Sequence, residues 1–174
     1  MFSSFFKIAL ILGSFLLLMA CGGEATEDSC VGGEPTAIFE GIAAFEHHEF
    51  EKNGQESVEK IVVPDLNMGI ELYQSGCDRI EQEFRILLNE PYELNTPAPY
   101  CALHIANILV LLSEKAPEQL GALQQWAEAI RADAQKMAYN EQVQLTNSSI
   151  YVQIDKTHQS NSAILSVVFA QSVE

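Results

Sequence analysis

The sequence has little positive charge: its 174 residues include 9 lysines and arginines against 24 aspartates and glutamates, a formal net charge of −15. So few cations exclude the basic patch that nucleic-acid binding requires, so we expect no nucleic-acid partner. Apolar residues nevertheless make up 48% of the chain, whereas a disordered acidic tail contains few of them. Composition and length therefore indicate one acidic, folded domain.

Catalytic and metal-binding motifs are also scarce. The chain contains no G-x-S-x-G nucleophile elbow, no H-E-x-x-H motif and no C-x-x-C pair, and its glycine pairs lie near the N-terminus, outside any phosphate-binding loop. Carboxylate pairs such as Glu81 and Glu83 are interpreted as a solvated acidic face, because isolated carboxylates are usually exposed. We therefore expect neither enzymatic activity nor a cofactor.

The N-terminus carries an apolar run of about a dozen residues, which follows Lys7 and ends at Leu18-Met19-Ala20-Cys21. A resident membrane-spanning helix needs about 20 such residues. The end of the run resembles the lipobox of bacterial lipoprotein signal peptides. This resemblance, which covers residues 1–21 alone, implies cleavage before Cys21 and its lipidation, and Gly22 implies transport to the outer membrane. An ordinary secretory signal or an uncleaved anchor are the alternatives.

The predicted organisation is a signal peptide over residues 1–20, a lipidated acidic tether over 21–36 and a single domain over 37–174. Removing the signal leaves 8 cations against 24 anions, a net charge of −16. Several acyl chains, palmitate among them, on Cys21 would anchor the protein lastingly in the membrane. The domain is then expected to face the periplasm, with exposure at the cell surface as the alternative.

Lipidation of Cys21 leaves three cysteines for an oxidising compartment, where a pair normally forms a disulfide. Cys77 follows a Ser-Gly turn and Cys101 lies near the start of an apolar helix, so both belong to the folded part. Cys30 lies in the tether. The preferred bridge is therefore Cys77–Cys101, and Cys30 is the alternative partner of either.

The first half of the domain reads as strands. Residues 37–51 and 55–63 flank Asn53-Gly54, the strongest short-range hairpin signal, and 68–74 form the next strand. Over 79–88 the apolar residues alternate with charged ones, which indicates a half-buried strand. The alternation places Ile80, Phe84, Ile86 and Leu88 on one face, opposite Arg79, Glu81, Glu83 and Arg85.

Two helices and further strands complete the pattern. Residues 100–115 are apolar almost all round, and a second helix from Pro117 carries one apolar stripe. The stripe consists of Leu120, Leu123, Ala127, Ile130, Ala134 and Met137. Strand patterns follow over 143–154, where Asn147-Ser148-Ser149 marks a bulge or a turn, and over 163–173, with a polar connector over 156–162. We expect an α+β domain in which about four strands, two helices and then two strands form a mostly antiparallel sheet with the helix pair packed on it.

The cluster Glu46-His47-His48-Glu49 holds the best candidate metal ligands. Neighbours in a regular strand point to opposite faces, so His47 and His48 could share one ion only across a bulge. They are therefore interpreted as surface histidines, and no metal is expected. His104 is expected in the core, and His158 on the exposed connector.

The leading hypothesis is a non-catalytic lipoprotein that binds another protein. Strong acidity favours a cationic partner, and the specific form is an inhibitor or immunity protein for a cationic cell-wall-degrading enzyme. The contact is expected on the acidic hairpin of residues 39–60, at Glu46, Glu49, Glu51 and Glu56. One alternative is a structural accessory of an outer-membrane complex that docks through the helix pair, and another is a metal-binding protein using His47 and His48.

Overall fold

The computed structural model describes residues 34–76, 79–89, 92–93, 95–159 and 162–172. Within them, seven strands form one antiparallel sheet. The strands are β1 (Glu46–Asn53), β2 (Glu56–Val63), β3 (Met68–Ser75), β4 (Arg79–Leu88), β5 (Val143–Gln144), β6 (Ile150–Gln159) and β7 (Ser162–Ser172). The helices are α2 (Ala98–Lys115) and α3 (Pro117–Asp133), and 3₁₀ turns cover Pro64–Leu66 and Ala134–Lys136.

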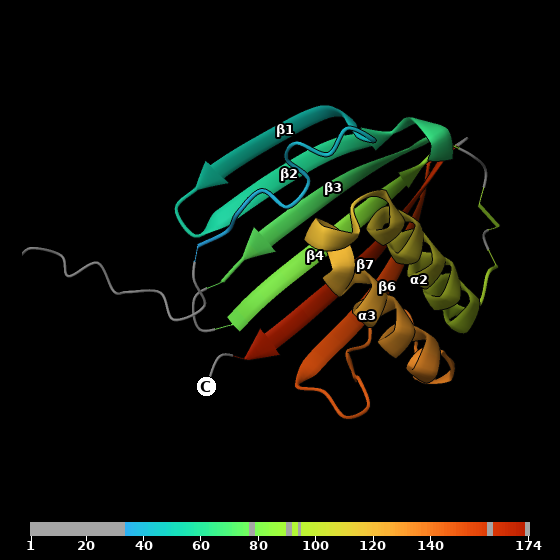
Figure 1. The fold of residues 1–174 in the computed structure, drawn as a ribbon. Helices are drawn as coiled ribbons and strands as arrows, with labels where there is room; N and C mark the ends of the chain where they lie inside the picture. Colours follow the sequence, from blue (N-terminus) through green and yellow to red (C-terminus); the bar gives the residue numbers. More distant parts are fainter. Residues whose placement is uncertain (1–33, 77–78, 90–91, 94, 160–161, 173–174) are drawn as a thin grey trace, which may run out of the picture.

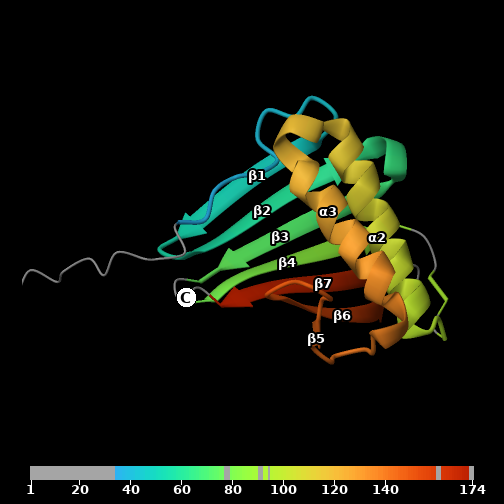
Figure 2. The ribbon, with the colours of Figure 1, turned by 60° about the horizontal axis from the view of Figure 1, so that its bottom comes forward.

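The strands lie side by side in the order β1-β2-β3-β4-β7-β6-β5. After the two helices the chain returns to pair β7 with β4 at the middle of the sheet, while β6 and β5 extend it outward. Both helices pack on one face (Figures 1 and 2). The predicted α+β class and the packing of the helix pair are confirmed. Three strands rather than two follow the helices, because the two residues of β5 pair with Tyr151 and Val152.

The first hairpin forms where Asn53-Gly54 predicts it. Asn53 pairs with Glu56 across the two-residue loop Gly54-Gln55, and Gly54 has φ +62°, as the first loop position of a type II′ turn requires. The first strand, however, begins at Glu46 rather than at residue 37. The residues before it form successive turns, with backbone hydrogen bonds from Ile42 to Phe39 and from Phe45 to Ile42.

Residues 34–45, named the strap from here on, lie over β2 and β3 on the same face as the helices (Figure 1). Phe39, Ile42 and Phe45 are buried there. These apolar residues recur every third position, whereas a strand would bury every second one. The prediction of a strand over residues 37–45 was wrong because a spacing of three places all three side chains on one side of a series of turns.

The inner face of the sheet, toward the helices and the strap, is the apolar one. Ile61 and Val63 of β2 pair in register with Ile70 and Met68 of β3, and the same face continues across the sheet. Its buried side chains include Ile70, Leu72, Phe84, Ile86, Ile154, Leu165 and Val167. The predicted two-residue alternation along β4 is confirmed: Phe84 and Ile86 are buried, and the arginines and glutamates of β4 lie on the opposite, outer face.

The helix predictions are confirmed with shifted ends. Every residue of the predicted α3 stripe is buried, although the helix ends at Asp133 and the last two stripe residues follow it. Trp126 lies at the edge of the stripe, with its ring centroid 4.4 Å from that of Phe169. The prediction of a polar connector over 156–162 was wrong, since β6 continues to Gln159 and β7 begins at Ser162.

Candidate functional site

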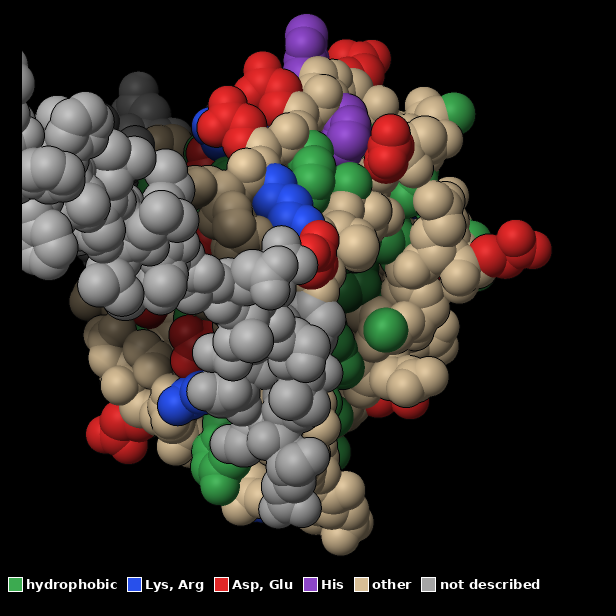
Figure 3. Space-filling view, turned by 90° about the vertical axis from the view of Figure 1, so that its left-hand side faces the viewer, with side chains coloured by type: hydrophobic (Ala, Val, Ile, Leu, Met, Phe, Trp, Pro, Cys, Tyr) green, Lys and Arg blue, Asp and Glu red, His purple; other side chains and the backbone are tan. Residues whose placement is uncertain are grey.

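The four glutamates singled out in the sequence lie together. Three of them lie on β1, opposite residues of β2 that belong to the outer face: Glu46 opposite Val62, Glu49 opposite Lys60 and Glu51 opposite Val58. The fourth, Glu56, pairs with Asn53 beside the turn. All four glutamates are exposed. This group is named the acidic edge. Figure 3 shows acidic side chains gathered along the upper rim, where β1 lies in Figure 1.

The acidic edge differs from its surroundings in having no close ionic partner, although the exposed Lys60 lies opposite Glu49 on the outer face. Within the part of the chain that the structure describes, none of its four carboxylates accepts a hydrogen bond or forms an ion pair. Farther along the outer face, Glu81 is paired with Arg79 at 2.9 Å and Glu83 with Arg85 at 2.8 Å. The acidic edge therefore presents its charge to solvent, whereas the acids of β4 have partners within the fold.

The centre of the outer face holds a linked set of polar side chains. The guanidinium of Arg85 lies 4.1 Å from the centroid of the Tyr73 ring, and Glu83 also accepts a hydrogen bond of 2.6 Å from Ser166. Burial opposes ionisation of Glu83, but the hydrogen bonds from Arg85 and Ser166 outweigh it and lower the pKa of Glu83. Glu81 and Glu83 do share one face of the sheet, and each forms an ion pair with an arginine.

A β-bulge separates the two adjacent histidines. The register of β1 against β2 shifts between Glu46 and Glu49, and His47 has φ +52°. The bulge turns His48 toward the inner face, where Nε2 lies 2.7 Å from Oε1 of Glu59. His47 is exposed. Among the described residues, no group of three His, Cys, Asp or Glu side chains could hold a metal ion.

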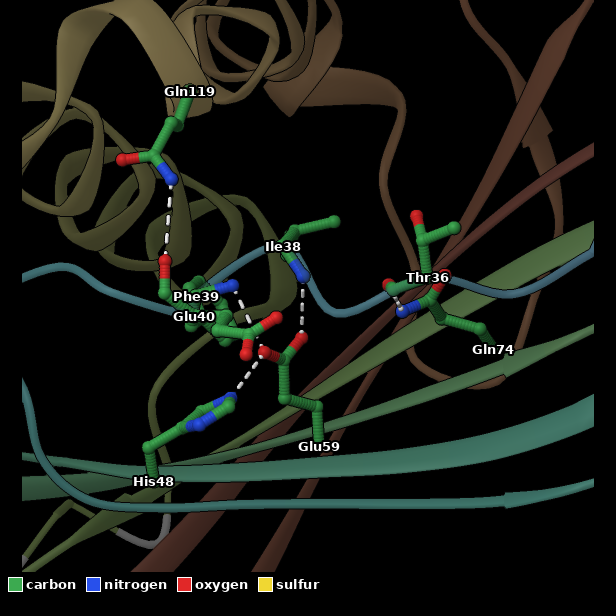
Figure 4. A network of polar contacts seen from close by, with 8 residues as sticks. All are labelled: Thr36, Ile38, Phe39, Glu40, His48, Glu59, Gln74 and Gln119. Carbon is green, nitrogen blue, oxygen red and sulfur yellow. Dashed lines mark hydrogen bonds and ion pairs between the residues drawn. The ribbon is translucent and has the colours of Figure 1, made fainter.

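Glu59 is the residue that the sequence reasoning missed. Its carboxylate is fully buried and accepts backbone N–H groups of the strap, from Ile38 at 2.8 Å and from Phe39 at 2.9 Å. Together with His48, these donors surround the carboxylate (Figure 4). A signal was available, because Glu59 shares the alternating phase of Ile61 and Val63 and so occupies an inner-face position.

Three further hydrogen bonds hold the strap, one of them from Lys52 to Glu34. Nε2 of Gln74 donates to the carbonyl of Thr36 at 2.8 Å, and Nε2 of Gln119 in α3 donates to the carbonyl of Glu40 at 3.2 Å (Figure 4). The strap is thus fixed to the sheet and to a helix. It ends beside the acidic edge, because Glu46 directly follows it in the chain.

Ser57 and Lys60 of β2 have the S-x-x-K spacing found in enzymes that form an acyl-serine intermediate. Ser57 is buried on the inner face, while Lys60 is exposed on the outer face. Residues three apart in a strand point to opposite faces. They therefore do not form the nucleophile and base of an acylation site.

Cys101 carries a free, buried thiol at the start of α2. Burial raises its pKa, against hydrogen bonds with Tyr139 and Tyr92 that lower it. Cys77 and Cys30 lie outside the described residues, as does the lipidation site Cys21. The predicted disulfide is accordingly not seen at Cys101.

Two histidines differ from the expected environments, since His104 is exposed and His158 is partly buried. His104 lies on α2, where its ring packs against Tyr92 with centroids 5.5 Å apart and desolvation lowers its pKa. His158 lies in β6 instead of a connector, and its Nε2 atom is buried. Neither histidine lies in the acidic edge.

Within the described ranges, no helix combines the length and the apolar character needed to cross a membrane. Comparison of the chain with models of protein families, with curated proteins and with solved structures finds no match.

Proposed function

We propose that this protein is a bacterial envelope lipoprotein, anchored through Cys21, that binds a cationic protein through its acidic edge and has no catalytic role. The observation that carries the proposal is the set of four exposed carboxylates on one face of the β1–β2 hairpin, without partners among the described residues. The specific form is an inhibitor or immunity protein that blocks a cationic enzyme acting on the cell wall.

Electrostatics supports a cationic partner over an acidic one. The chain carries a formal net charge of −15, so it repels anionic surfaces and attracts cationic proteins over roughly a Debye length, about 10 Å at moderate salt. Exposed, unpaired carboxylates contribute to such steering without first breaking an internal ion pair. They accelerate encounter more than they add affinity.

Internal contacts hold the strap against the sheet and α3. This arrangement suits a binding module at the end of a tether. The strap is pinned by Glu59, Gln74 and Gln119, and the acidic edge begins directly after it. A lipid anchor at Cys21 would therefore keep the domain and its acidic edge at the outer membrane, within the periplasm.

The test is a pull-down and kinetic comparison with three chains that span residues 22–174. The acidic-edge variant carries Glu46→Lys, Glu49→Lys, Glu51→Lys and Glu56→Lys. A matched control reverses four exposed glutamates elsewhere, with the same change in net charge: Glu93→Lys, Glu114→Lys, Glu128→Lys and Glu141→Lys. Envelope extract is applied at low and at high salt.

We expect the unaltered chain and the control to retain the same basic protein at low salt and to release it at high salt. The acidic-edge variant should lose it, and its association rate with the isolated partner should fall at least about tenfold and depend less on salt. Equal retention by the acidic-edge variant, or equal loss by the control, would contradict the proposal.

The alternative of a structural accessory docking through the helix pair has less in its favour. The apolar stripes of α2 and α3 are buried within the domain, and the large exposed apolar residues of α2 are Tyr100 and Leu111. A large assembly retained at high salt and released by Tyr100→Ala together with Leu111→Ser would favour this alternative.

A further inference from the structure

Three of the four glutamates of the acidic edge lie on β1, a strand whose second side has no partner among the described residues. β1 is the first strand in the sheet order and pairs with β2 alone. An edge strand presents a row of free backbone N–H and C=O groups, which can hydrogen-bond an added strand from another chain. β1 spans Glu46–Asn53, long enough for several such hydrogen bonds.

The register identifies which residues of β1 present these groups. Asn53 and Glu56 close a two-residue turn, and the closing pair of such a turn exchanges both hydrogen bonds. Alternation then directs the backbone groups of Glu49, Glu51 and Asn53 toward β2. The backbone groups of Phe50 and Lys52 point to the open edge.

The bulge sets one limit to this edge. His47 has φ +52°, and the regular register resumes at Glu49. A bulge interrupts the spacing that an added strand needs. Residues 49–53 are therefore the regular stretch of the edge.

The side chains of this stretch determine which strand can join it. Glu49 and Glu51 lie two residues apart on the outer face, exposed and without ion pairs within the described residues. A second copy of this chain would place glutamates close to these glutamates, and like charges on adjacent strands repel. A strand with lysine or arginine at alternate positions would place opposite charges there, which is favourable.

We propose that the partner binds by strand addition: an extended cationic segment with basic side chains at alternate positions pairs with β1 along residues 49–53. Its backbone hydrogen-bonds Phe50 and Lys52, and its basic side chains lie beside Glu49 and Glu51. The inference rests on the proposed function and adds to it the conformation and the sequence pattern of the bound segment.

Two labelled peptides of equal charge test the strand. One alternates lysine with threonine, which favours extended pairing. The other alternates lysine with proline, which lacks half of the backbone donors. Fluorescence anisotropy should show at least tenfold tighter binding of the lysine–threonine peptide to the unaltered chain. Equal affinities for the two peptides, or no binding of the lysine–threonine peptide, would overturn strand addition.

Two substitutions of one residue test the edge of β1. Lys52→Pro removes an N–H that faces the open edge, where proline is tolerated. Lys52→Ala is its control, since both variants lose the ion pair with Glu34 and keep the acidic edge. We expect at least tenfold weaker binding of the lysine–threonine peptide to Lys52→Pro and less than twofold weaker binding to Lys52→Ala. Equal effects of the two substitutions would overturn the proposal.

Amide exchange in the unaltered chain keeps the proposal testable if Lys52→Pro does not fold. Addition of the lysine–threonine peptide should slow exchange at Phe50 and Lys52 and leave Glu49 and Glu51, already bonded to β2, unchanged. Uniform protection, or none at Phe50 and Lys52, would overturn it. The same variants can be tested with the envelope partner. If the acidic-edge variant no longer binds that partner but Lys52→Pro binds it fully, strand addition is overturned and the proposed function still stands.

Discussion

Nε2 of His48 lies 2.7 Å from Oε1 of Glu59, so side chains as well as the backbone join the edge strand β1 to its neighbour. The contact depends on the bulge at His47, which brings His48 to the inner face. Because the same carboxylate accepts the N–H groups of Ile38 and Phe39, one buried glutamate fixes both the strap and the strand that carries the acidic edge.

Glu59→Ala should therefore lower the free energy of unfolding by about 3–5 kcal/mol, because it leaves two buried backbone N–H groups and a histidine without their acceptor. Urea denaturation followed by circular dichroism measures the change. Glu56→Ala, three residues earlier and exposed, is the control and should stay within about 0.5 kcal/mol. A loss below 1 kcal/mol for Glu59→Ala would show that water replaces the carboxylate.

Phe39 tests the apolar part of the strap independently. It is 1% exposed, and its ring meets that of Phe45 edge-to-face at 5.6 Å. Phe39→Ala should cost about 3–5 kcal/mol in the free energy of unfolding, through lost burial and the cavity left behind. Tyr100→Ala, at a position 66% exposed, should change it little. Similar values for the two variants would show that the strap contributes nothing to the core.

Regular alternation made most of the fold predictable. The period of two along β4 and the apolar stripe of α3 each reflect a single buried face, so the sequence alone identified those elements and their orientation. The strap was not predictable in this way. Its buried residues, Phe39, Ile42 and Phe45, follow successive turns, and that spacing resembles neither a strand nor a regular helix.

The candidate site was predictable where it depends on local geometry. Gly54, at the first position of the two-residue loop, permits the turn, and the hairpin brings Glu46, Glu49, Glu51 and Glu56 onto one surface. Glu59 was not predictable from charge, since a glutamate in an acidic chain is expected at the surface. Its burial depends on donors from the strap and from His48, which approach only in the folded domain.

Asp133 links the end of α3 to the loop before β6, and its effect on stability should depend on pH. Hydrogen bonds from Lys136 and from the N–H of Thr146 lower its pKa from 3.8 to about 2. The ionised carboxylate thus stabilises the fold above its ordinary pKa, and this contribution disappears as the pH falls through about 2.

Asp133→Asn should accordingly lower the free energy of unfolding by about 1–3 kcal/mol at neutral pH. The difference in free energy of unfolding between the variant and the unaltered chain should shrink as the pH falls from about 4 to about 2. Thermal unfolding at several pH values measures both. Asp65→Asn, which removes an exposed ion pair with Lys115, is the control and should cost less at neutral pH. A difference that stays constant over the acidic range would contradict this role for Asp133.

Cys101 should remain a protected thiol in the folded domain. It is fully buried, burial raises its pKa, and the thiolate is the reactive form. In a chain with Cys21→Ser, Cys30→Ser and Cys77→Ser, a thiol reagent should react with native Cys101 at least about a hundredfold more slowly than in denaturant, because reaction requires local opening. Tyr100→Cys combined with Cys101→Ala supplies the control, a thiol one residue away at an exposed position, and it should react at once. Rapid reaction of native Cys101 would show that the start of α2 opens in solution.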